Sequence, residues 1–179
     1  MQINEWRSIL FQHKLIGYNE NLGVGYGNIS AKYPGSEGLF VISGTQTGHL
    51  PILTPEHYSL VTGYDLEKNF LSCTGPIKAS SEALTHAAVY ALPESFEAVI
   101  HVHHFGLWEN LLHKIPTTQE EITYGTPEMA KEVRRLWEEK NLGAYQIFAM
   151  AGHVEGLISF GHSAQEAGEI LMSYFHRYT

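Results

Sequence analysis

Residues 80–104 read SSEALTHAAVYALPESFEAVIHVHH and hold four of the chain's eleven histidines. The first half predicts a helix, because leucine and alanine recur at helical spacing from Leu84 onward until Pro93 ends the pattern. The second half predicts a buried strand, because residues 98–102 are almost all apolar. A helix followed by a buried strand is therefore the central unit of the predicted fold.

Side chains that can bind a metal lie on both halves of this unit. Side chains alternate between the two faces of a strand, so His101 and His103 point the same way. Glu82 and His86 are four positions apart and share one face of the predicted helix. Two imidazoles on one strand are only half of a zinc site. This stretch alone therefore fits a metal site and an ordinary buried strand equally well.

The composition indicates a globular protein that does not bind nucleic acid. A length of 179 residues suits one domain spanning residues 1–179, and 44% hydrophobic residues suffice for a core. The formal net charge of −8 disfavours binding to a phosphate backbone. A small anionic substrate stays compatible with this charge, because local donors or a metal override it.

Three features of the sequence indicate the cytoplasm. Cys73 is the single cysteine, so no internal disulfide forms, which fits a reducing compartment. The first residues lack the basic region and long apolar run of a secretory signal. No stretch reaches 18 apolar residues, so we expect no membrane-spanning helix.

The rest of the chain predicts a mixed α/β domain without repeats or linkers. Helical spacing and start signals predict further helices at 2–17 with Gly17 as the stop, after Thr54, and over 105–113, 127–141 and 164–177. Ser163 and Glu166 form a predicted capping box before the last helix. Alternation and apolar runs predict strands at 27–33, 38–42, 58–65, 69–74, 145–151 and 157–160.

Three loops have the composition of ligand-binding segments. Residues 23–30, GVGYGNIS, have glycine at alternate positions, which allows a ligand to approach closely or makes a tight turn. Residues 43–48, SGTQTG, offer hydroxyl and backbone N–H groups to an anion, or form a plain loop. Residues 151–156, AGHVEG, place a histidine and a glutamate between two predicted strands, as metal ligands or as an ordinary polar turn.

Six short motifs, taken in order, resemble the class II aldolase/adducin family. They are GNIS at 27–30, SG at 43–44, SSE at 80–82 with a histidine four residues on, HVH at 101–103, YGTPE at 124–128 and GLI at 156–158. No single motif is specific, but their order and separations are. The resemblance implies a three-layer α/β/α domain around a mainly antiparallel sheet. It also implies a four-fold homotetramer with active sites between neighbouring subunits.

The resemblance implies roles for individual residues. Glu82 matches the catalytic acid/base, and His101 and His103 match two zinc ligands. The cradle for the substrate phosphate matches Gly27, Asn28, Ser43, Gly44, Ser80 and Ser81. The expected cofactor is Zn²⁺ or another divalent metal, which stabilises an enediolate as a Lewis acid while Glu82 moves the proton.

The turn at 151–156 departs from the family pattern. The family commonly has its third histidine immediately before the glycine of the GLI motif, where this chain has Glu155, and His153 lies two residues earlier. Either His153 or Glu155 completes the site, or the site is impaired. We expect His153, because zinc prefers imidazole here and a turn absorbs a two-residue shift. Better-known aldolases and the related epimerase extend beyond the position of Thr179, and their additional catalytic residues have no match here.

The leading expectation is a cytoplasmic, zinc-dependent aldehyde-lyase that cleaves a small phosphorylated ketose by retro-aldol chemistry. An epimerase or a dehydratase for sugar phosphates would use the same scaffold. A non-catalytic, adducin-like binding module is a different class, and the presence of Glu82, His101 and His103 argues against it. The expected partner is a phosphorylated sugar, with no nucleic acid or membrane.

Overall fold

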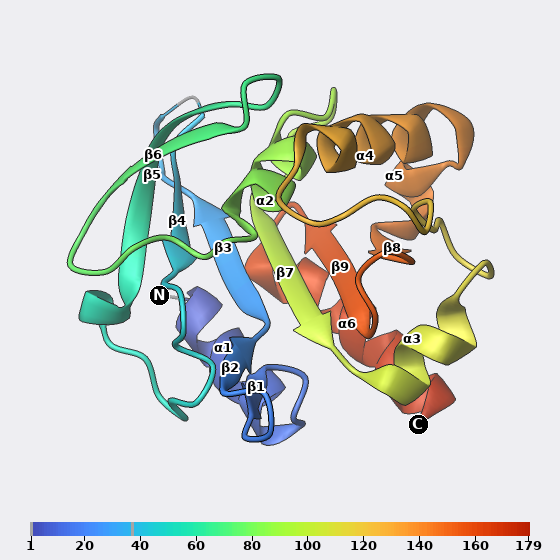
Figure 1. The fold of residues 1–179 in the computed structure, drawn as a ribbon, viewed down its shortest axis with the longest axis horizontal. Coiled ribbons are helices and arrows are strands. Elements are labelled where there is room, and N and C mark those ends of the chain that lie inside the picture. Colours follow the sequence, from blue (N-terminus) through green and yellow to red (C-terminus); the bar gives the residue numbers. More distant parts are fainter. Residues whose placement is uncertain (1, 37) are drawn as a thin grey trace.

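The strands form one large antiparallel sheet and one small hairpin (Figure 1). The computed structural model describes residues 2–36 and 38–179. Seven strands lie in the order β6-β5-β4-β3-β7-β9-β8, and every neighbouring pair is antiparallel. In chain order they are β3 (Asn28–Lys32), β4 (Phe40–Ser43), β5 (Tyr58–Asp65), β6 (Phe70–Thr74), β7 (Ala98–His103), β8 (Ile147–Ala149) and β9 (Gly156–Gly161). The hairpin pairs β1 (Gly17–Asn19) with β2 (Val24–Tyr26).

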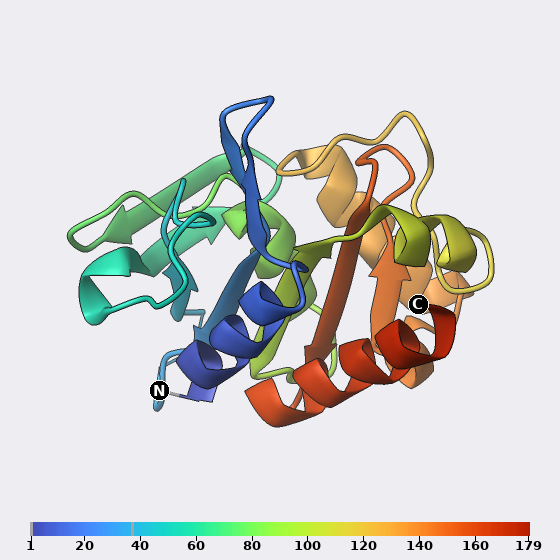
Figure 2. The same ribbon diagram turned by 90° about the horizontal axis from the view of Figure 1, so that it is seen from below.

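Helices cover both faces of the large sheet, which confirms the predicted three layers (Figure 1 and Figure 2). One face carries α1 (Gln2–Gln12) and α6 (Ala164–Tyr178), and the other carries α2 (Ala83–Tyr90) and α4 (Pro127–Glu139). Each face has its own hydrophobic core, so burial of apolar surface stabilises the sheet from both sides. The short helices are η1 (Pro55–His57), α3 (Phe105–Leu111) and α5 (Leu142–Tyr145). Within the described ranges, none of the helices combines the length and hydrophobicity that crossing a bilayer requires.

The central strand β7 decides where the histidines lie. Ile100 and Val102 point into the core under α1 and α6, whereas Val99 points into the core under α2 and α4. His101 and His103 have the same parity as Val99, so they continue the face covered by α2. The apolar core therefore gives way to a polar site along this one strand face.

The first helix ends earlier than predicted. It stops at Gln12 rather than at Gly17, and Gly17 instead opens β1. Lys14 adopts the left-handed conformation with φ of 58°, and the N–H groups of Leu15 and Ile16 both donate to the carbonyl of Leu10. This helix-ending turn leaves Leu15 and Ile16 free to be buried outside the helix.

Two other predicted elements are shorter than expected. The strand predicted at 145–151 is only Ile147–Ala149, because Tyr145 belongs to α5 and Gln146 ends that helix with φ of 50°. The start signal at Thr54 opens the single turn η1 rather than a full helix, since the chain enters β5 directly afterwards.

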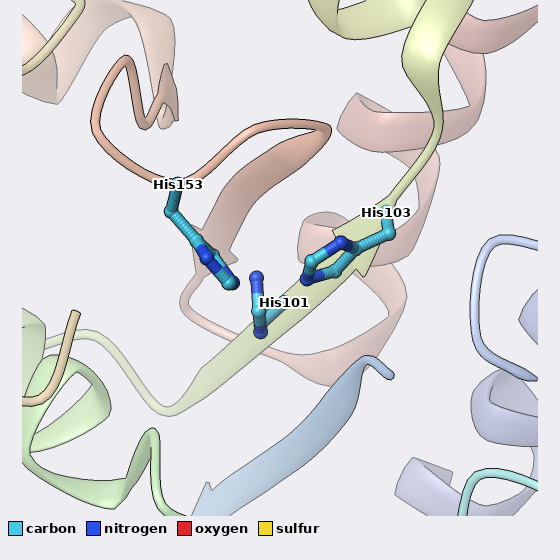
Figure 3. A group of neighbouring side chains, drawn as sticks. All are labelled: His101, His103 and His153. Carbon is cyan, nitrogen blue, oxygen red and sulfur yellow. The ribbon is translucent and has the colours of Figure 1, made fainter. Parts of the chain in front are cut away.

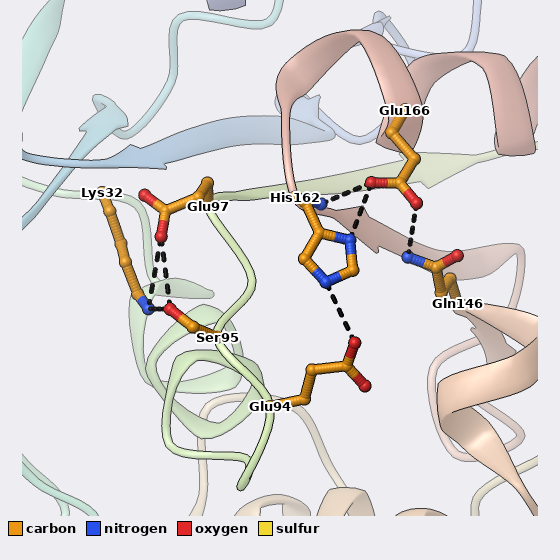
Figure 4. A network of polar contacts seen from close by, with 7 residues as sticks. All are labelled: Lys32, Glu94, Ser95, Glu97, Gln146, His162 and Glu166. Atoms are coloured by element: carbon orange, nitrogen blue, oxygen red, sulfur yellow. Dashed lines mark hydrogen bonds and ion pairs between the residues drawn. The ribbon is translucent and has the colours of Figure 1, made fainter.

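The last helix begins with half of the predicted capping box. The hydroxyl of Ser163 accepts a hydrogen bond from the N–H of Glu166 at 3.0 Å. The Glu166 carboxylate accepts from the backbone N–H of His162 at 2.6 Å rather than from Ser163. The His162 ring also bridges Glu166 and Glu94, each 3.0 Å away (Figure 4). This network ties the start of α6 to the loop that follows α2.

Candidate active site

Three histidines from two separate segments meet at the end of β7 (Figure 3). His101 and His103 extend from β7, and His153 reaches them from the turn between β8 and β9. One ligand atom from each ring can be chosen so that all three lie within 4.8 Å of one another. The antiparallel register of β7 and β9 positions the turn, because it places Gly156 opposite His103.

The free nitrogen atoms of this cluster fit a metal ion. His101 Nε2 and His153 Nε2 are buried and have no hydrogen-bond partner within residues 2–36 and 38–179. An unpaired buried polar atom costs about 1–3 kcal/mol, so atoms of this kind mark a site for an ion or a water molecule. Three imidazoles with one open position are the ligand set of many catalytic zinc sites. The cluster can therefore hold a metal ion.

The surroundings keep the imidazoles of β7 uncharged. Burial lowers the pKa of His101 well below its ordinary value, and the neighbouring His103, His153 and His86 lower that pKa further. Burial, with a further contribution from His153, lowers the pKa of His103 to about 3. Metal ligation requires neutral imidazole, so both side chains are in the required protonation state near pH 7.

The Asn28 side chain can select the ligand nitrogen of His101. The amide nitrogen of Asn28 lies 3.3 Å from His101 Nδ1, and the amide oxygen is buried without a partner among the described residues. Turning the amide by about 180° places its oxygen beside Nδ1, where it accepts a hydrogen bond from Nδ1–H. This arrangement satisfies the unpaired oxygen and leaves a lone pair on Nε2 for a metal.

The carboxylate of Glu82 faces the same cluster from the start of α2. Its side chain is buried, and Oε1 lies 3.3 Å from His153 Nε2 and 3.8 Å from His101 Nδ1. The 3.3 Å approach lacks hydrogen-bond geometry, so His153 Nε2 stays unpaired. The Thr85 hydroxyl donates to Oε2 at 3.2 Å. One oxygen of Glu82 is thus anchored while the other faces the histidines.

The histidines and Glu82 line a cavity of about 760 Å³. The same cavity is lined by five residues of the predicted phosphate cradle, namely Gly27, Asn28, Gly44, Ser80 and Ser81. Ser43, the sixth, does not line it. Its side chain is buried, and the hydroxyl accepts a hydrogen bond from the N–H of Ile29 at 3.1 Å. The structure therefore brings together every predicted site residue except Ser43.

Backbone donors for an anion come from neighbours of Gly44 rather than from Gly44 itself. The N–H of Gly44 donates to the carbonyl of His57 at 2.8 Å and is committed there. The N–H groups of Gln46 and Gly48 have no protein acceptor in the described part of the chain, and both residues line the cavity. The composition of the 43–48 loop predicted backbone N–H donors for an anion. The tertiary structure decides which of these N–H groups have no acceptor within the protein.

Glu155, the alternative third ligand, lies at the edge of the cluster. Its Oε2 is 4.0 Å from His103 Nδ1, and its side chain is 45% exposed, compared with 18% for His153. Its φ of 71° is the left-handed conformation of a tight turn, and its carbonyl accepts from the N–H of His104 at 3.1 Å. The geometry favours His153 as a ligand and leaves Glu155 beside His103.

Three residues that border the site received no role from the sequence. The ring centroid of Tyr124 lies 4.4 Å from that of His153, and the Tyr26 centroid lies 5.7 Å from that of His103. Both tyrosines line the cavity. Tyr124 opens the YGTPE motif and Tyr26 interrupts the glycine-rich stretch, but an aromatic residue in a loop gives no signal of where it points. Thr85, which anchors Glu82, resembles any helix threonine in the sequence.

One protein family matches most of the chain. The sequence model of the family described as "Class II Aldolase and Adducin N-terminal domain" matches residues 13–174. The chain belongs to this family. The match therefore includes Glu82 and all three histidines of the cluster. No curated protein matches the chain.

Solved structures share the fold of this aldolase/adducin-family chain. L-fuculose-1-phosphate aldolase from Thermus thermophilus has a TM-score of 0.63 and 21% identity, over 97% of this chain and 84% of that one. A sugar-phosphate aldolase from Thermotoga maritima has a TM-score of 0.71 and 16% identity, over 97% and 88%. YgbL from Klebsiella pneumoniae, described by the alternatives aldolase, epimerase and decarboxylase, has a TM-score of 0.67 and 21% identity, over 96% and 82%. Identities this low establish the fold and not the reaction, and the family also has non-catalytic adducin members.

Proposed function

We propose that this chain is a metal-dependent aldehyde-lyase that cleaves a small phosphorylated ketose by retro-aldol chemistry. The observation that carries the proposal is the buried Oε1 of Glu82, which faces three histidines in a cavity that also holds uncommitted donors. A buried carboxylate beside a metal-ligand set is typical of a catalytic site and unnecessary in a binding module. The neighbouring structures named as fuculose-phosphate and sugar-phosphate aldolases support the substrate class.

His101, His103 and His153 would hold the metal. We propose Zn²⁺, because three imidazoles without a thiolate suit this ion, although another divalent metal would fit the same ligands. When bound, the cation supplies a Lewis acid that stabilises negative charge on the oxygens of the ketose. The protein contributes neutral imidazoles and the orienting amide of Asn28.

Glu82 is proposed to move the proton. Its Oε1 takes a proton from the hydroxyl on the carbon that becomes the aldehyde, and the bond from that carbon to the carbon beside the ketone breaks. The electron pair of the broken bond passes into the ketone system, and Glu82 later returns the proton to the carbon beside the ketone. The products, an aldehyde and a shorter ketone phosphate, account for every atom. Thr85 holds Oε2 so that Oε1 stays turned toward the reacting groups.

The substrate phosphate is proposed to bind between the start of α2 and the 44–48 loop. Ser80 and Ser81 precede α2, whose N-terminus carries partial positive charge. Gly27 and Asn28 border the same cavity from the start of β3. Ser43 is proposed to act indirectly, through its hydrogen bond to the neighbouring strand. Binding the remote phosphate would orient the reacting carbons beside Glu82.

We also propose that residues 1–179 form one domain, that the chain assembles as a homotetramer and that it works in the cytoplasm. The tetramer rests on the family resemblance, and the cytoplasm rests on the single cysteine. Analytical ultracentrifugation tests the tetramer, and a sedimenting monomer would overturn it.

Turnover of a panel of ketose phosphates tests the proposed reaction. The zinc-loaded protein is incubated with each sugar, and the products are followed by NMR. New aldehyde and ketone-phosphate signals are expected. An epimeric or dehydrated sugar phosphate would instead identify an epimerase or a dehydratase. Binding of every phosphorylated sugar without turnover would favour an adducin-like binding module.

A further inference from the structure

Arg7 is a buried cation without an anionic partner in the described part of the chain. It lies on α1, is 1% exposed and forms no ion pair with any carboxylate in the described ranges. Its Nη1 is buried and has no hydrogen-bond partner among residues 2–36 and 38–179. An uncompensated buried charge costs several kcal/mol, so a fold retains one where the charge has a use.

The other terminal nitrogen of Arg7 holds the loop that borders the cavity. Nη2 donates to the carbonyl of Thr47 at 3.1 Å and to the carbonyl of Gly48 at 3.2 Å. In a trans peptide unit the N–H points opposite to the C=O. Fixing the Thr47 carbonyl toward Arg7 therefore turns the N–H of Gly48 away from Arg7. That N–H is one of the uncommitted donors of the cavity lining.

The loop is packed too tightly to move independently of this anchor. The Thr47 hydroxyl donates to the carbonyl of Gly44 at 2.8 Å, which closes the loop. The backbone of Gly48 packs against Gly17 and Gly25: a Cβ on Gly48 would collide with the carbonyl oxygen of Gly17, and a Cβ on Gly25 would lie 3.1 Å from the Gly48 nitrogen. Close-packed segments transmit displacement, so the position of Arg7 sets the position of the loop donors.

No group within the described protein neutralises Arg7. Burial raises the pKa of Tyr58 to about 12, and its hydroxyl donates to the side-chain oxygen of Asn4 at 3.0 Å, so Tyr58 is uncharged near pH 7. Burial also lowers the pKa of Arg7, but from 12.5, so the guanidinium stays protonated. The ring of Phe11, 4.9 Å from the guanidinium carbon, is only a weak counterpart.

The cavity beside Arg7 is short of positive charge. Its described lining contains three carboxylates, from Glu20, Glu82 and Glu155, and Lys14 as its only lysine or arginine. Even with a divalent metal held by the three histidines, these charges sum to zero, so a dianionic ligand there would gain from further positive charge nearby. The buried guanidinium behind the 44–48 loop is screened little by salt, so it can supply this charge.

We propose that Arg7 is a positioning residue for the anionic group of the ligand. It holds in place the 44–48 loop, which carries the uncommitted N–H groups of Gln46 and Gly48, and it places a fixed positive charge beside that loop. The inference rests on the proposed function, since a phosphate monoester is the anion that would use this charge. Arg7 does not line the cavity, so it acts through the loop rather than by contact.

Binding of inorganic phosphate to the zinc-loaded protein at pH 7.5 tests this role by calorimetry. Arg7→Gln keeps an amide donor but loses the positive charge. Arg7→Lys keeps the positive charge but loses the planar guanidinium group with its several N–H donors. We expect Arg7→Gln to weaken phosphate binding about 10–100-fold, as misplacement of binding groups does, and Arg7→Lys to weaken it less. Zinc affinity should be unchanged in both variants. The exposed Arg134→Met is the matched control and should behave as wild type.

Each outcome of this experiment decides a separate point. Wild-type phosphate affinity in Arg7→Gln would overturn the role of Arg7. Equal losses in Arg7→Gln and Arg7→Lys would overturn the role of its charge and leave only the loop anchor. Failure of the wild type to bind any phosphate would instead overturn the proposed phosphorylated substrate. If Arg7→Gln does not fold, the Arg7→Lys variant tests the loop anchor. Wild-type phosphate affinity in Arg7→Lys would show that the guanidinium group is not needed to hold the loop.

Discussion

The third metal ligand can be identified by comparing His153→Ala with Glu155→Ala. Removing His153 leaves two imidazoles and deletes a buried, unpaired nitrogen that faces the cluster. Removing Glu155 leaves all three imidazoles and deletes a carboxylate that is 45% exposed and 4.0 Å from His103. We therefore expect the two substitutions to differ sharply in their effect on zinc binding.

The size of the difference follows from ligand-linked stability. At a zinc concentration about 100 times the wild-type Kd, binding adds about 2.7 kcal/mol to the free energy of unfolding. For a chain of this length that raises Tm by about 5–11 °C. If loss of a ligand weakens zinc binding about 100-fold, the stabilisation by zinc falls to about 0.4 kcal/mol, which is a Tm shift of about 1–2 °C. If Glu155→Ala weakens zinc binding no more than about tenfold, zinc still stabilises that variant by about 1.4 kcal/mol.

Calorimetric melting of chelator-treated protein, with and without zinc, measures both shifts. The metal-free Tm of each variant controls for damage to the fold itself. A zinc shift retained in His153→Ala and lost in Glu155→Ala would refute the assignment, and the site would then be two histidines and one carboxylate.

Glu82→Gln should still bind zinc but turn over the substrate about 10²–10⁴-fold more slowly, and a wild-type kcat would reduce Glu82 to a structural role. Gly27→Ala should lower the free energy of unfolding by about 2–5 kcal/mol, because φ is 75° and a Cβ would lie 2.7 Å from the Ile16 side chain. An unchanged midpoint of urea unfolding would contradict this. Burial lowers the pKa of His86 to about 3, against about 6.5 in the unfolded chain. Between these pH values the unfolded state binds one more proton than the folded state, so the free energy of unfolding falls as pH is lowered. Below about pH 6 the wild type should lose about 1.4 kcal/mol per pH unit more than His86→Gln, and parallel profiles would count against a neutral His86.

The mixed α/β class was predictable because its signals are local: the apolar run of β7 and the helix before it show their periods within a few residues. The three-layer arrangement came from the family resemblance, whose motifs HVH and GLI lie on β7 and β9. The boundaries that differed depend on Lys14 and Gln146, which adopt positive φ. Neither residue type favours that conformation strongly, so the sequence carried little sign of these helix ends.

The Arg7 anchor was not predictable, and the role of Ser43 was only partly so. Arg7 reaches carbonyls 40 and 41 positions along the chain, and it does so only because α1 packs against the sheet beside that loop. Ser43 belongs to a motif of the phosphate cradle, but its hydroxyl is used by Ile29 in the neighbouring strand. Both outcomes depend on which segments become neighbours, and composition does not encode this.

The sequence by itself determined that His101 and His103 share a strand face, because alternation along one strand is a local property of the backbone. It left His153 and Glu155 as alternatives for the third ligand, because the reach of a turn depends on the strands that it joins. The register of β9 against β7, with Gly156 opposite His103, brings the His153 ring beside the pair and leaves Glu155 at the edge. That choice belongs to the tertiary structure, since the pairing of distant strands decides which side chains face one point.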